Sequence, residues 1–115
     1  MATTTITNHA TMSTPTITAS KDVDSTSIRA RRVGTVLFLE GYVVVKAQTY
    51  TGNNTVLFST DALPSGIRFF DIFDSKSAGS TSYVGKIFAN GEIKFNNTIS
   101  FTANTYLFFN AAIPL

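Results

Sequence analysis

His9, the single histidine of the chain, is the first candidate for a general acid–base residue or for the base of a nucleophilic triad. It lies in a Thr-rich segment, with no carboxylate or nucleophile at an informative spacing. A Ser-His-Asp triad would have to recruit it from there, and the absence of cysteine removes both a thiol nucleophile and the usual zinc sites. The sequence therefore predicts a protein that is not an enzyme, with no catalytic residues, no metal site and no cofactor.

Asp71 and Asp74 are a second place where chemistry could occur. Side chains three residues apart on a strand point to opposite faces, so these carboxylates are poorly placed for paired acid–base work. Two interpretations remain open: a cation bound by these carboxylates and nearby loop hydroxyls, or a solvated turn that Asp74 opens. The Asn-Asn-Thr sequences at 53–55 and 96–98 would accept glycans only in a eukaryotic secretory pathway, and they equally suit turns that precede strands.

The elements that position these residues follow from the composition. The 115 residues include 35 Thr, Val and Ile but only three Glu and Gln. β-Branched residues lose side-chain freedom in a helix and pack well on a pleated sheet, so this balance favours strands. Short strand-like runs separated by turn residues predict an all-β fold, an antiparallel β-sandwich of jelly-roll type.

The chain divides into a Thr-rich N-terminal arm or linker at 1–14 and a β-sandwich head domain at 15–115. Within the head, Asn90-Gly91 predicts a hairpin with a two-residue type I′ turn, and Gly41 indicates a bulge. Eight or nine strands are expected: a weak first strand at 15–19, and then 27–33, 35–48, 55–60, 68–73, 83–89, 92–95, 98–102 and 105–113.

Two of these strands, at 35–45 and 106–113, are apolar on both faces. A sheet in a small sandwich normally shows one face to water, so the second face needs a cover. Another subunit or the N-terminal arm could provide it, and partial exposure of single residues is the simpler alternative. We expect an oligomer rather than a monomer.

Charge and hydropathy narrow the possible partners. Nine Lys and Arg against seven Asp and Glu give a net charge of only +2. The one basic cluster, Arg29 with Arg31 and Arg32, is explained by a solvated strand edge, so no nucleic-acid partner is expected. Apolar runs such as 43–45 are too short to insert into a membrane, and residues 1–27 lack the apolar core of a signal peptide, so synthesis in a cytoplasm is expected.

The order of the motifs is more informative than any single residue. Over about residues 28–113 the chain resembles the C-terminal head domains of receptor-binding and baseplate proteins from tailed phages and prophages of Gram-positive bacteria. It departs from that pattern at Phe69, where the family often has Pro. The resemblance is carried, in this order, by Val33–Val43, Thr55–Phe58, Leu63-Pro64-Ser65-Gly66-Ile67-Arg68, Gly85–Ile93 and Ala103–Phe108.

This resemblance implies a trimer around a threefold axis that attaches a virion to host cell-surface saccharide. The implied location is the virion tail, assembled in the host cytoplasm, with other tail or baseplate proteins as further partners. The alternative is a structural adaptor of the baseplate that only holds other tail proteins.

If the protein is such a head, its saccharide site should lie in loops, because the faces of the sandwich are needed for core and trimer contacts. The loops at 49–54 and 74–83 carry Tyr50 and Tyr83, whose rings could lie against a sugar. The remaining candidates are Asn53, Asn54 and Asp74, which could bind sugar hydroxyls, and Arg68, which could bind a phosphate. In the structural alternative, Tyr50 is tucked onto the end of the sheet and Arg68 anchors its turn by a salt bridge.

Overall fold

The computed structural model describes residues 11–76 and 82–115, and this part of the chain is all-β, without a helix. Its strands are β1 (Met12–Ser13), β2 (Ile17–Ala19), β3 (Val23–Val33), β4 (Val36–Val45), β5 (Thr49–Tyr50), β6 (Val56–Thr60), β7 (Arg68–Asp74), β8 (Ser82–Ile87), β9 (Glu92–Phe95), β10 (Ile99–Ser100) and β11 (Thr105–Pro114).

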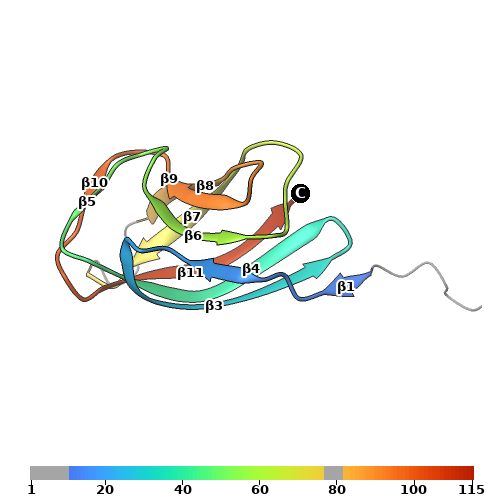
Figure 1. The fold of residues 1–115 in the computed structure, drawn as a ribbon, viewed down its shortest axis with the longest axis horizontal. Coiled ribbons are helices and arrows are strands. Elements are labelled where there is room, and N and C mark those ends of the chain that lie inside the picture. The colour runs from blue at the N-terminus through green and yellow to red at the C-terminus, as the bar shows by residue number, and fades with distance from the viewer. Residues whose placement is uncertain (1–10, 77–81) are drawn as a thin grey trace, which may run out of the picture.

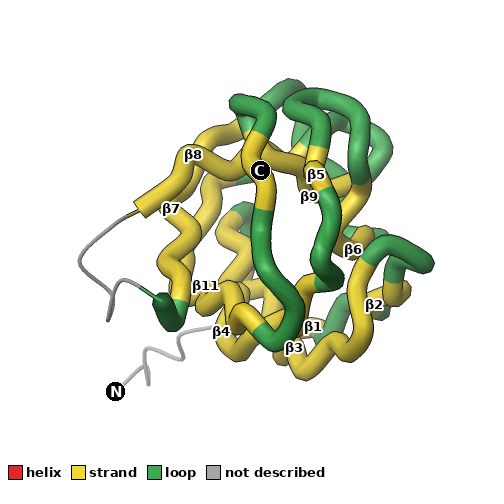
Figure 2. Tube along the Cα trace, turned by 90° about the vertical axis from the view of Figure 1, so that its left-hand side faces the viewer, coloured by secondary structure: helices red, strands yellow, loops and turns green. Residues whose placement is uncertain are grey.

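Nine of these strands form one antiparallel sheet in the order β1-β3-β4-β11-β7-β8-β9-β6-β2. The sheet curls into a half-barrel: in Figure 2 it follows an arc from β3 and β4 at the bottom past β7 and β8 on the left to β9 and β6 on the right. The small β5–β10 sheet lies at one end of it (Figure 1). The all-β antiparallel prediction is confirmed, although one continuous sheet takes the place of the two expected sheets.

The two ends of the sheet approach each other without pairing. β1 and β2 are separated by only three residues, yet they lie at opposite ends of the strand order. A groove of about 920 Å³ lies beside this seam: Pro15 and Ile17 line one side of it, and residues 28–31 of β3, 38–40 of β4 and 110–112 of β11 line the rest. Met12 and Ser13, which the sequence places in the arm, pair with Val33 and Arg32 and so belong to the sheet.

The core fills the inside of the half-barrel through the alternation expected of strands. In β4 the odd-numbered positions face inward, and Leu37, Leu39, Val43 and Val45 are buried there. Aromatic rings from distant strands complete the core, for example Phe58 of β6 against Phe109 of β11. Full burial of a side chain of this size contributes about 1.5–3 kcal/mol, so these inner residues fix the curl of the sheet.

The hairpin between β8 and β9 exists, but its predicted turn type is wrong. Only Gly91 of the Asn90-Gly91 pair has a positive φ, of 85°. The Gly91 N–H donates to the Phe88 carbonyl at 2.8 Å, and the Phe88 N–H donates to the Glu92 carbonyl at 2.9 Å. These bonds define a three-residue loop in which Gly91 forms a bulge after a tight turn.

The bulge predicted at Gly41 is also wrong, because both neighbouring strands keep their register there. Gly41 is needed for a different reason: its φ is 124°, and a Cβ atom would lie 2.0 Å from the carbonyl oxygen of Ser27. The irregularity lies instead between Val23 and Ser25 of β3.

Candidate functional site

Tyr50 belongs to the core, which corrects its predicted role in stacking on a sugar. Its side chain is 0% exposed, and its ring packs edge-on against Phe95 and Phe101. The hydroxyl donates to the carbonyl of Asp22 and accepts from the N–H of Lys46. Burial raises the pKa of this tyrosine. The structure therefore matches the alternative in which Tyr50 is tucked onto the end of the sheet.

Tyr83 and Asp74 form a hydrogen-bonded pair on the inner side of β7 and β8. The Tyr83 hydroxyl donates to the Asp74 carboxylate, and this bond raises the pKa of Tyr83 to about 12. Asp74 is only 4% exposed, and the Tyr83 ring packs edge-on against Phe95 and Phe101. The pair thus links two strands, and residues 77–81 of the predicted 74–83 loop site lie outside the described residues.

Arg68 anchors its turn, as the structural alternative expected, but through hydrogen bonds instead of a salt bridge. Its Nε donates to the Pro114 carbonyl at 3.0 Å, and its Nη2 donates to the Ser65 hydroxyl at 2.9 Å. A third bond, from Nη1, reaches the carbonyl of Ile67. The guanidinium therefore ties the turn at 63–66 to the end of β11.

Asn53 and Asn54 are exposed on the turn before β6, as the sequence predicts for a loop site. Asn53 has a positive φ of 64°, and its N–H donates to the Phe95 carbonyl at 2.8 Å, which fixes the turn beside β9. Its side-chain oxygen accepts a 2.7 Å hydrogen bond from Nζ of Lys86. Asn53 is thus joined to a cationic side chain.

This contact belongs to a larger cluster on the outer side of the β7–β8–β9 region, which we call the lysine surface: Asn53, Phe69, Lys86, Phe88 and Lys94. Lys86 and Lys94 are direct cross-strand partners. Nζ of Lys94 lies 4.7 Å from the centre of the Phe88 ring, and Nζ of Lys86 lies 5.4 Å from that of Phe69. Phe69 is 63% exposed. The cluster combines an exposed ring, an amide and two cations, which are groups that can bind a polar ligand.

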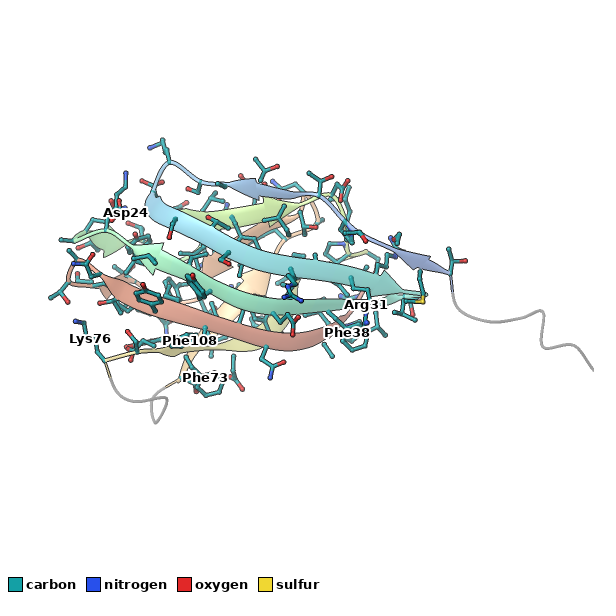
Figure 3. The ribbon with its side chains drawn as sticks, turned by 90° about the horizontal axis from the view of Figure 1, so that it is seen from below. Asp24, Arg31, Phe38, Phe73, Lys76 and Phe108 are labelled. Carbon is teal, nitrogen blue, oxygen red and sulfur yellow. The ribbon has the colours of Figure 1, made fainter. Side chains whose placement is uncertain are left out.

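A second set of outward side chains, the aromatic face, covers β4, β11 and the end of β7. Its centre is a cluster of three rings, Tyr42, Tyr106 and Phe108, with centroids 5.0–6.5 Å apart. Phe73 is the cross-strand partner of Phe108, which is 42% exposed. Figure 3 shows Phe108 and Phe73 on neighbouring strands, with Phe38 and Arg31 toward the other end of the same face. This is the second apolar face that the sequence predicted, and it has no cover within the described chain.

Sequence reasoning missed the lysine surface because of one residue of register. A two-residue turn at Asn90-Gly91 would pair Ile87 with Lys94, whereas the observed loop pairs Lys86 with Lys94. A slip of one residue moves side chains to the other face of a sheet, so the two lysines could not be placed together from the sequence.

The comparisons with known proteins give no family: no protein-family model, curated protein or solved structure matches this chain. Within residues 11–76 and 82–115, no three His, Cys, Asp or Glu side chains gather in a way that could bind a metal ion. In the same part of the chain, no helix is long and apolar enough to cross a membrane.

Proposed function

We propose that this protein is the head of a phage tail or baseplate receptor-binding protein, which attaches a virion to host cell-surface saccharide without catalysing a reaction. The observation that carries the proposal is the lysine surface, in which the exposed ring of Phe69 lies next to Lys86 and Asn53. A sugar is bound by an apolar ring face together with amide and charged groups that meet its hydroxyls, and Phe69, Asn53 and Lys86 present this combination next to each other.

We further propose that the head is a homotrimer whose subunits meet through the aromatic face. Exposed aromatic clusters of this kind mark association surfaces. Three half-barrels arranged in this way would take the place of the jelly-roll-like sandwiches found in such heads. Assembly also multiplies weak saccharide binding, because several linked sites engage one cell surface.

The attachment function is tested with cell walls from a panel of Gram-positive bacteria. Labelled protein should sediment with untreated walls and remain in solution when their polysaccharide has been oxidised with periodate. Absence of binding to every wall in the panel would contradict attachment, and it would favour the alternative of a baseplate adaptor.

A further inference from the structure

The cross-strand pair Lys86 and Lys94 is unusual because like charges lie directly opposite each other. Such a pair is destabilising in a sheet, and it needs a compensating anion. Glu92 supplies one, with a carboxylate oxygen 3.1 Å from Nζ of Lys94. No ion pair within residues 11–76 and 82–115 includes Lys86, whose ammonium instead donates to the neutral amide of Asn53. Of the two cations, Lys94 has the carboxylate of Glu92 beside it and Lys86 has the neutral amide of Asn53.

The positions of both ammonium groups are set in advance by their neighbours. Nζ of Lys94 lies over the Phe88 ring and 3.5 Å from the carbonyl oxygen of Asn53. The side chain of Lys94 is only 14% exposed, so its charge is partly removed from water. Nζ of Lys86 lies between the Phe69 and Phe88 rings, 5.4 and 5.9 Å from their centres. Cations that are held in place and partly desolvated attract an incoming anion more strongly than mobile surface lysines do.

Glu92, which lies next to the lysine surface, already has partners within the protein. Glu92 accepts a hydrogen bond from the Asn90 side chain at 2.9 Å, and this bond, with help from Lys94, lowers the pKa of Glu92. The turn that carries Asn90 also places the Phe88 ring beside both lysines. The negative charge that would balance the second lysine must therefore come from outside the cluster.

We propose that the lysine surface binds an anionic sugar, with the sugar ring against Phe69 and its carboxylate or phosphate between Lys86 and Lys94. The proposal rests on the attachment function and specifies its ligand class. A nucleic acid fits less well, because backbone tracking needs a longer basic stripe than one lysine pair.

The test is a titration of the ¹⁵N-labelled full chain, followed by NMR, with methyl glucuronide, glucose 6-phosphate, methyl glucoside and inorganic phosphate. Both anionic sugars should shift the amide signals of Asn53, Lys86 and Lys94 at lower concentration than the other two probes. The two anionic sugars separate a carboxylate ligand from a phosphate ligand. Equal binding of methyl glucoside would overturn the role of charge. Inorganic phosphate binding as tightly as both anionic sugars would overturn the role of the sugar ring. Oligothymidylate is titrated as a further probe, and equally tight binding of this nucleic acid would also overturn that role.

Three variants locate the site. Lys86→Gln and Lys94→Gln should each weaken binding of the anionic sugar at least about tenfold, since each removes a charge-assisted contact. Lys21→Gln is the matched control, because it removes one exposed lysine of the β2–β3 turn and should bind like the parent. Unchanged binding in both cluster variants would overturn the site.

The same variants separate this inference from the attachment function. If the parent and both lysine variants sediment equally with cell walls, attachment holds and the lysine surface is not its site. If the anionic sugar binds at these residues while no wall in the panel is bound, the site holds and the attachment function fails.

Discussion

The aromatic face and the lysine surface both display phenyl rings to solvent, but they surround those rings differently. On β4 and β11 the rings of Tyr42, Tyr106 and Phe108 contact each other. On the lysine surface the rings of Phe69 and Phe88 are each approached by an ammonium group. A ring cluster loses unfavourable contact with water when another apolar surface covers it, whereas rings next to cations suit a wet, charged ligand. The exposure of a ring alone therefore does not indicate which kind of partner it binds.

The largest effect that separates the two regions should come from removing the rings of the aromatic face. In the double variant Tyr106→Ser with Phe108→Ser, each subunit contact loses two rings that would each contribute about 1.5–3 kcal/mol on burial. Light scattering should then report the 12.4 kDa monomer in place of a trimer. Circular dichroism should still show a β-sheet spectrum, because both side chains point away from the core.

The matched control for that double variant is Phe69→Ser on the lysine surface, which should leave the oligomer intact. A parent protein that is already monomeric at micromolar concentration would contradict the trimer. Loss of the oligomer in the Phe69 variant would show that the two regions are not separate in function.

The next largest effect should be a loss of stability caused by straining the backbone of β4 at Gly41, beneath the aromatic face. In Gly41→Ala the new Cβ would meet the Ser27 carbonyl oxygen, and alanine would have to adopt a φ of 124°. We expect a loss of about 3 kcal/mol in the free energy of unfolding, measured by urea denaturation. Gly66→Ala is the control, because its Cβ would approach only the Arg68 guanidinium, at 3.3 Å, and the substitution should be close to neutral.

A smaller effect on the free energy of unfolding should come from the hydrogen-bonded pair Tyr83 and Asp74, which had been predicted to form part of a surface loop site. Hydrogen bonding to Asp74 raises the pKa of Tyr83 from its ordinary value of 10.0 to about 12. The stabilisation is therefore complete below pH 10 and is lost as the pH rises through 12. At pH 8, Tyr83→Phe should cost about 1 kcal/mol, and the difference from the parent should shrink between pH 10 and 12 in urea denaturation. A difference that stays constant over this range would contradict the assignment.

The smallest effect on stability should come from the lysine surface itself. Lys86→Gln removes one of two opposed cations, and glutamine can still donate to Asn53, so the free energy of unfolding should change by less than about 0.5 kcal/mol. A loss above 2 kcal/mol, on the order of a buried contact, would mean that Lys86 supports the fold and is not held for a ligand. Thermal denaturation of parent and variant under the same salt conditions measures this difference.

The class of the fold and much of its strand pattern can be predicted from the residues alone. The β-branched composition and the alternation of Leu37, Leu39, Val43 and Val45 suffice for that, because strand periodicity is a local property of the chain. The same alternation predicted the uncovered aromatic face, since most outward positions of β4 and β11 are apolar whichever strands pair with them. The exposed Asn53 turn was also readable from its Asn-Asn sequence.

The contacts between side chains of different strands depend, in contrast, on how the whole chain folds. Tyr50 looked like a loop residue, yet the short β5–β10 sheet carries it into the core, and that pairing joins residues about fifty positions apart. The half-barrel likewise depends on the order in which the strands pair, and local periodicity does not reveal that order. The lysine surface depends on one residue of register at Gly91: the expected two-residue turn would place Ile87 opposite Lys94, whereas the observed loop places Lys86 there.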